Sequence, residues 1–111
     1  MSSKAAQARF RALQDLGCIC CLLECVGWMA PDIHHIVDKG YREHSGGDMA
    51  TIPLCPWHHR GLTPEGMTTD AAVYRLGPSL ALNKRLFVRT YGGERELLEQ
   101  VNAQLNMRKT A

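Results

Sequence analysis

The sequence predicts a small α+β domain that is stabilised by zinc. Apolar residues recur at helical spacing near both ends of the chain, two short β-type segments lie in the middle, and two Cys/His pairs have zinc-knuckle spacing. A chain of 111 residues can bury only a modest core, which a bound metal would support. We expect one domain over 1–111, with an N-terminal helix in 1–17, a zinc-knuckle core in 18–66 and a helical tail in 67–111.

The first segment predicts a helix over residues 3–16. Ser2 or Ser3 can cap this helix, Phe10, Leu13 and Leu16 recur in it at a spacing of three, and Gly17 supplies a stop. The segment is charged throughout, which argues against a secretory signal, and no part of the chain approaches the roughly 20 apolar residues that span a bilayer. We therefore expect a cytoplasmic, reducing setting, where cysteines are more often metal ligands than disulfides.

Five short segments make up the expected core. Residues 18–28, CICCLLECVGW, are too cysteine-dense for an ordinary strand and predict a tight hairpin. Residues 31–37 and 51–55 predict strands, and the glycine-rich stretch 38–50 between them predicts a polar loop. PWHHRG, residues 56–61, predicts a single helical turn with a proline at its first position.

The tail predicts three helices that support the core by packing. The first covers 68–77, capped by Thr69 and ended by Gly77, and the second lies within 78–93. The third covers 94–107, where four apolar residues have helical spacing: Leu97, Leu98, Val101 and Leu105. The formal net charge of +2 conceals a basic stretch over 71–93, which has four cations and no acid. Such a stretch suits contact with a polyanion, although a solvated helix face is the simpler interpretation.

The cysteines and histidines predict a closed zinc site. Cys18 with Cys21 and Cys55 with His58 each have the x2 spacing at which two ligands of one turn reach one ion. Together they supply the four ligands of a tetrahedral structural site. Cys21-x3-Cys25 is a competing choice for the first pair, and Cys20 and Cys25 would otherwise be buried free thiols.

Three further histidines predict a second, open metal site. On a helical turn His59 projects about 100° away from His58, so it need not bind the knuckle ion. His34 and His59 can therefore hold a separate ion with open positions, as a catalytic metal requires. His35 diverges from His34 on an extended segment, and a neutral imidazole is well placed as a general base at neutral pH.

The motifs IHHIVDKG, TIPLCPWHHRG, GPSLA and YGGERELL carry a resemblance. They resemble the HNH (ββα-metal, His-Me finger) endonucleases and, more narrowly, the Ref-like family of phage recombination-enhancement, RecA-dependent nucleases. The resemblance runs from about Cys18 to Leu105. It implies a ββα-metal core, hydrolysis of DNA phosphodiester bonds, a bacterial host cell, and action with RecA filaments.

The resemblance also implies roles for single residues. His34 and His59 correspond to ligands of the catalytic ion, which is Mg²⁺, Mn²⁺ or Zn²⁺, and His35 corresponds to the general base. The four knuckle residues correspond to structural zinc ligands. HNH proteins usually carry an asparagine between the two elements, and here Asp48 or a backbone group must brace the loop instead.

Three cations are candidates for contact with the DNA backbone: Lys39, Arg42 and Arg60. His44, in the same loop, is either a further metal neighbour or an ordinary surface residue. Two other functions compete with the nuclease. A non-catalytic zinc-stabilised nucleic-acid-binding module explains the knuckles but leaves His35 without a role. A redox-sensing or metal-handling protein that uses Cys20 and Cys25 explains neither the histidine pairs nor the helices.

Overall fold

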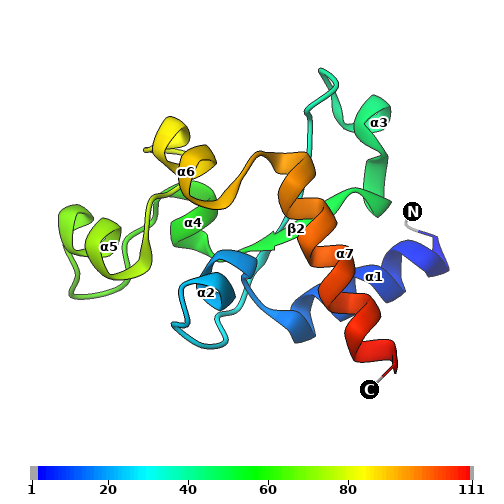
Figure 1. The fold of residues 1–111 in the computed structure, drawn as a ribbon, viewed down its shortest axis with the longest axis horizontal. Coiled ribbons are helices and arrows are strands. Elements are labelled where there is room, and N and C mark those ends of the chain that lie inside the picture. Colours follow the sequence, from blue (N-terminus) through cyan, green and yellow to red (C-terminus); the bar gives the residue numbers. More distant parts are fainter. Residues whose placement is uncertain (1–2, 111) are drawn as a thin grey trace.

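The computed structural model describes residues 3–110, with side chains from Ser3 to Arg108. The chain forms a small α+β fold with one two-stranded sheet, as the sequence predicts. In chain order the elements are α1 (Lys4–Leu16), α2 (Ile19–Leu23), β1 (Asp32–His35), α3 (Arg42–Ser45), the 3-10 turn η1 (Gly47–Met49), β2 (Thr51–Leu54), α4 (Pro56–Arg60), α5 (Thr69–Leu76), α6 (Lys84–Tyr91) and α7 (Glu94–Thr110) (Figure 1).

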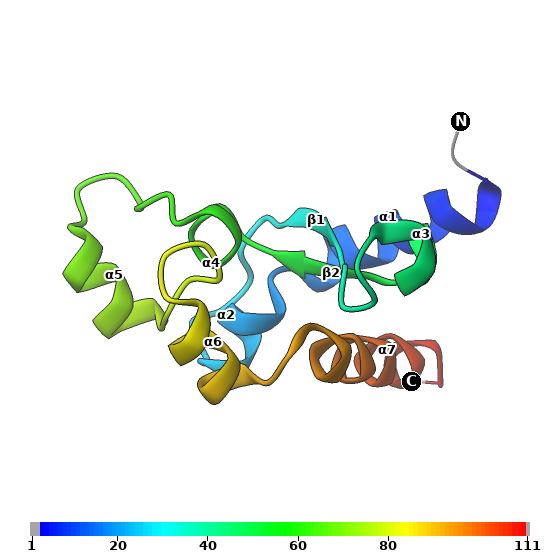
Figure 2. The same cartoon turned by 90° about the horizontal axis from the view of Figure 1, so that it is seen from above.

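The sheet is an antiparallel pair in which His34 lies opposite Ile52 and His35 opposite Thr51. All four residues of β2 are buried, whereas those of β1 are half-buried. This difference arises because β2 lies between α1 and α7, as Figures 1 and 2 show together. The sheet is therefore a small platform that presents the polar side chains of β1 near its surface.

The core joins both ends of the chain to the central strands. Leu13 of α1, Ile52 of β2, Trp57 of α4 and Leu97 of α7 are at most 2% exposed. The Trp57 indole also donates to the carbonyl of Gly77 at 2.9 Å, which ties α4 to the end of α5. The helical tail thus packs on the core around the central strands, as the sequence predicts.

The prediction of a hairpin over 18–28 is wrong, because the chain forms the helical turn α2 there. The sulfur of Cys18 caps this turn and accepts from the backbone N–H of Cys21 at 3.4 Å. Cysteine density therefore marked a capped helical turn rather than a strand pair. Smaller differences occur elsewhere: Thr68, not Thr69, caps α5, the loop 38–50 contains α3 and η1, and α6 begins only at Lys84.

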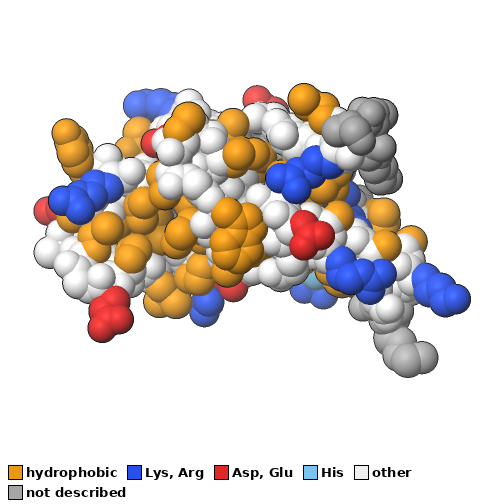
Figure 3. Space-filling model, turned by 90° about the horizontal axis from the view of Figure 1, so that it is seen from below, with side chains coloured by type: hydrophobic (Ala, Val, Ile, Leu, Met, Phe, Trp, Pro, Cys, Tyr) orange, Lys and Arg blue, Asp and Glu red, His pale blue; other side chains and the backbone are white. Residues whose placement is uncertain are grey.

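The five-residue helix α2 buries only its cysteines and Ile19, so its apolar neighbours remain in solvent. Exposed apolar side chains gather along α2 and the loop after it: Leu22, Leu23, Val26, Trp28 and Met29. Figure 3 shows hydrophobic side chains collected on this face. Among the described residues, no helix has the length and apolar character needed to cross a membrane.

Candidate metal centres

The two predicted knuckles come together as one buried cluster. Cys18 and Cys21 are on the turn that begins α2, and Cys55 and His58 are on the turn that begins α4. Both turns start in the same way, with a cysteine sulfur that accepts a backbone N–H three residues later. The four ligand atoms all lie within 4.8 Å of one another, and all four residues are buried.

The distances in this cluster match a tetrahedral zinc site. The Sγ atoms of Cys21 and Cys55 are 3.8 Å apart, and Nδ1 of His58 lies 3.3–3.5 Å from the three sulfurs. Sulfurs bound to one zinc ion at about 2.3 Å are separated by about 3.8 Å, and a sulfur and a nitrogen by about 3.6 Å. The cluster can therefore hold a structural metal such as zinc.

The helical tail fixes the imidazole of His58 from behind. Nε2 of His58 donates to the carbonyl oxygen of Leu76 at 2.6 Å, so the neutral ring has its lone pair on Nδ1, facing the cluster. The hydroxyl of Tyr91 donates to the same carbonyl at 3.2 Å. Gly77 has a φ of 93°, and a Cβ there would overlap the Tyr91 hydroxyl. Glycine is therefore required beside the cluster.

The electrostatics of the cluster favour a cation. Hydrogen bonds from Cys20, Cys21 and Cys55 hold the pKa of the Cys18 thiol below its ordinary value. Desolvation opposes protonation of His58, but its bonds to the thiols of Cys18 and Cys55 outweigh that effect and raise its pKa to about 10. Positive charge is thus attracted to the point where the four ligands converge.

The two remaining cysteines lie outside this group. Cys20 is buried, and burial raises the pKa of its thiol, so it packs as a small neutral group. The prediction that Cys25 is buried is wrong: it is exposed, because it follows the end of α2, where it adopts a φ of 58°. The fold therefore pairs Cys21 with Cys18, and not with Cys25, as the ligands from the first turn.

A second pair of imidazoles converges on the other side of α4. Nδ1 of His34, on β1, lies 3.2 Å from Nε2 of His59, on α4. Their side chains are 16% and 25% exposed, so solvent reaches the pair. Burial lowers the pKa of His34, and its bond to Glu94 partly opposes this effect. The sequence prediction that His34 and His59 meet is consistent with this contact.

Two carboxylates hold the outer nitrogens of this pair. Glu94, the first residue of α7, lies with Oε2 2.7 Å from Nε2 of His34. Asp32 lies with Oδ2 3.0 Å from Nδ1 of His59. Neither carboxylate was singled out from the sequence. Asp32 had a usable signal, because it is two residues before His34 and shares its face of the strand, whereas Glu94 is distant along the chain.

His35 faces away from this pair. Its Nε2 lies 2.7 Å from Oδ1 of Asp48, and its ring makes an edge contact with Phe10 of α1, with centroids 6.2 Å apart. Asp48 lies in the loop where HNH proteins usually carry an asparagine, and here it contacts His35. The alternation of β1 sends His34 toward α4 and His35 toward α1, so the adjacent histidines have separate environments.

The three predicted DNA-contacting cations differ in their surroundings. Lys39 and Arg42 are exposed around α3. Arg60 is exposed as well, but its guanidinium pairs with Asp32 at 2.9 Å. His44 stacks on Tyr41, with ring centroids 4.2 Å apart. Among the described residues it belongs neither to the cysteine cluster nor to the His34–His59 pair.

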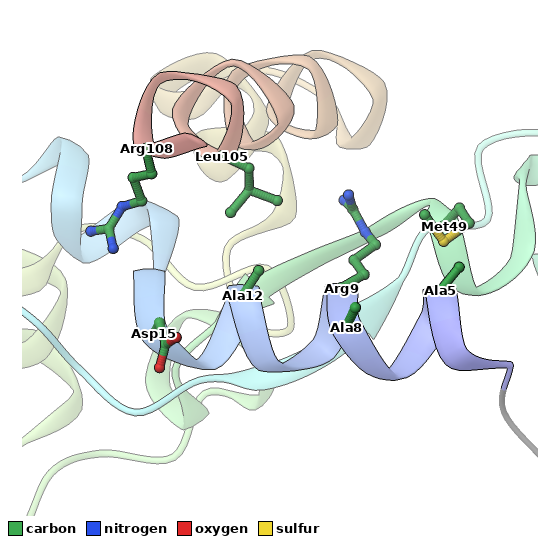
Figure 4. Close-up of a pocket in the computed structure, with 8 residues that line it drawn as sticks. All are labelled: Ala5, Ala8, Arg9, Ala12, Asp15, Met49, Leu105 and Arg108. Carbon is green, nitrogen blue, oxygen red and sulfur yellow. The ribbon is translucent and has the colours of Figure 1, made fainter. Parts of the chain in front are cut away.

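A groove of about 520 Å³ lies between α1 and α7. Figure 4 shows the alanines of α1 on one side, Leu105 on the other, and Arg9 directed toward α7. The Arg9 guanidinium donates to Thr51 and Asn102, so it ties the two helices and β2 together. None of the paired histidines lines this groove, which is therefore separate from both clusters.

The comparison with protein families covers almost the whole chain. The model of a family described as recombination enhancement, RecA-dependent nuclease matches residues 3–106. No curated protein and no solved structure matches the chain significantly. The matched range includes the cysteine cluster, both histidine pairs and most of α7. The chain therefore belongs to the recombination-enhancement, RecA-dependent nuclease family.

Proposed function

We propose that this protein is a metal-dependent DNA endonuclease of the HNH, or ββα-metal, type, which hydrolyses phosphodiester bonds during recombination together with RecA filaments. Membership of a RecA-dependent nuclease family supports the reaction class and the partner. The observation that carries the proposal is the convergence of His34 Nδ1 and His59 Nε2 at 3.2 Å, with both side chains partly exposed to solvent. Two nitrogens that bind one ion at about 2.1 Å, about 100° apart, have this separation.

His34 and His59 would hold the catalytic ion and leave its other positions open. A divalent cation bound there would stabilise negative charge on the phosphate and the leaving oxygen, as metal ions do in other phosphodiesterases. The two imidazoles hold the ion from one side only, one from β1 and one from α4. Such a two-residue site differs from the closed cluster of four ligands, which suits a structural zinc ion.

His35 would act as the general base that takes a proton from the attacking water. The carboxylate of Asp48 accepts from Nε2, which places the ring proton there and leaves the lone pair on Nδ1 for the water. His35 is the last residue of β1. A phosphodiester that crosses the end of this strand therefore meets His34 on one side and His35 on the other.

The structural cluster would set the position of this site. His58 belongs to the buried cluster, and the next residue, His59, contacts His34. A zinc ion that fixes the turn of α4 therefore also fixes the direction of His59. Lys39, Arg42 and Arg60 would hold the DNA backbone, supported by exposed cations on α5 and α6: Arg75, Lys84, Arg85 and Arg89.

The proposal is tested by nicking of supercoiled plasmid DNA with Mg²⁺ or Mn²⁺, with and without RecA filaments. We expect cleavage by the wild type, and a loss of about 10²–10⁴-fold in His35→Ala, because this is the usual contribution of a general base. Zinc content and circular dichroism of the variant should be unchanged. Absence of cleavage by the wild type under every condition would instead favour a non-catalytic zinc-stabilised nucleic-acid-binding module.

A further inference from the structure

We infer that Glu94 and Asp32 are positioning residues, which hold His34 and His59 in opposite tautomers so that both facing nitrogens present lone pairs to a cation. The inference deepens the proposed function and rests on it for its biological meaning. It concerns the ring protons of the protein with no ion between His34 and His59, however, and these can be measured without any cleavage assay.

The tautomer of His34 follows from its contact with Glu94. An ionised carboxylate only accepts hydrogen bonds, so the ring nitrogen that faces it must carry the proton. Oε2 of Glu94 lies 2.7 Å from Nε2 of His34. A neutral His34 therefore has its proton on Nε2 and its lone pair on Nδ1, which is the atom that faces His59.

The tautomer of His59 is the reverse. Oδ2 of Asp32 lies 3.0 Å from Nδ1 of His59, so a neutral His59 carries its proton on Nδ1 and its lone pair on Nε2. Two lone pairs then face each other at 3.2 Å, and neutral rings in these tautomers cannot share a hydrogen bond at that contact. A cation between the two nitrogens removes the conflict. Metal-binding histidines commonly have their second ring nitrogen bonded to a carboxylate in this way.

Both carboxylates are themselves held in place. Oε2 of Glu94 also accepts from the backbone N–H of Val37 at 3.3 Å, just beyond β1. Asp32 accepts from the Arg60 guanidinium at 2.9 Å through the same oxygen that faces His59. Each carboxylate thus joins its imidazole to a second group of the protein, and this restricts the rotation of both rings.

The first arm of the test is ¹⁵N NMR of the histidine rings at neutral pH. The protein carries one zinc ion in the cysteine cluster, and no other metal is added. We expect a protonated Nε2 in His34 and a protonated Nδ1 in His59. In Glu94→Ala, His34 should show a mixture of tautomers, whereas Glu94→Gln should retain the Nε2–H form, because the amide oxygen still accepts. Glu99→Ala, an exposed glutamate on the same helix, is the matched control.

The second arm is titration of the same proteins with Mn²⁺. Binding is measured by calorimetry and by the broadening of the His34 and His59 NMR signals. We expect Glu94→Ala to weaken Mn²⁺ binding by about 10–100-fold, with partial rescue in Glu94→Gln and no change in Glu99→Ala. Unchanged tautomers in Glu94→Ala, or the same tautomer in both wild-type rings, would overturn the inference. The predicted tautomers in a protein that cleaves no DNA would leave it standing and refute the proposed function alone.

Discussion

The histidines occur as two adjacent pairs, and each pair divides between two environments. In His34–His35 the alternation of an extended strand separates the rings, and in His58–His59 the rotation of a helical turn does so. His58 is fully buried among the cysteines, while His59 reaches His34 across the surface. The neighbours His58 and His59 thus link the closed cluster of four ligands with the open pair, which consists of His34 and His59.

The closed cluster gives a prediction at the level of one sulfur atom. Cys55→Ser should lose most of the bound zinc and lower the free energy of unfolding by about 3 kcal/mol or more, because the binding free energy of a structural zinc ion is also folding free energy. Zinc content by metal analysis and urea unfolding followed by circular dichroism measure both effects.

Cys25→Ser is the matched control, because Cys25 is an exposed cysteine outside the cluster. It should keep one zinc ion and wild-type stability. Full zinc retention in Cys55→Ser, or loss of zinc in Cys25→Ser, would contradict the ligand set.

At the scale of single elements, the first turn of α7 holds β1 and the loop after it in place. Glu94 reaches His34, and Arg95 forms two 2.8 Å contacts with the carboxylate of Asp38 and one of 2.9 Å with the carbonyl of Ser45. A helix that sequence periodicity identifies only as packing support therefore also contacts the candidate site and its loop.

The ion pair of Arg95 with Asp38 predicts that the stability of the fold depends on pH. The Arg95 guanidinium holds the pKa of Asp38 below its ordinary value of 3.8, so the ion pair stabilises the fold above that value and is lost as the pH falls through the lower folded-state pKa. Asp38→Asn should therefore be less stable than the wild type at neutral pH. The difference should shrink as the pH falls below about 4, since the wild-type carboxyl is then also neutral.

Thermal unfolding of both proteins between neutral and acidic pH measures this difference. Asp15→Asn, which changes an exposed aspartate outside the ion pair, is the control and should lack the effect. A stability difference between Asp38→Asn and the wild type that stays constant down to the lowest pH would contradict the role of the ion pair.

Sequence patterns predicted the elements whose signals are local. The helix α1 follows from its apolar spacing and its serine cap, and Ser3 does accept from the N–H of Ala6 at 3.0 Å. The hairpin over 18–28 was wrong, because the pattern of cysteines does not tell a capped helical turn from a strand pair. Glu94 could not be found because its contact with His34 depends on where α7 packs, which no local pattern encodes.

At the scale of the whole molecule, the two metal-type clusters and the tail form one connected structure. The knuckle pairs join α2 to α4, the carbonyl of Leu76 in α5 and the hydroxyl of Tyr91 in α6 fix His58, and α7 reaches the open pair. Residues far apart in the sequence therefore converge on the short helix α4. Spacing within each knuckle predicted the pairs, but only the fold brings the pairs together.

The proposed binding of the catalytic ion by His34 and His59 is the feature on which the proposed reaction depends. Its most direct test is the initial rate of plasmid nicking with Mn²⁺ and RecA filaments for the wild type, His34→Ala and His59→Ala, with His44→Ala as a control histidine that stacks on Tyr41. We expect both ligand variants to lose about 100-fold or more in rate, equivalent to about 3 kcal/mol of metal-supplied stabilisation, while His44→Ala stays near the wild type. Wild-type rates in His34→Ala and His59→Ala, with zinc content intact, would contradict the proposed binding.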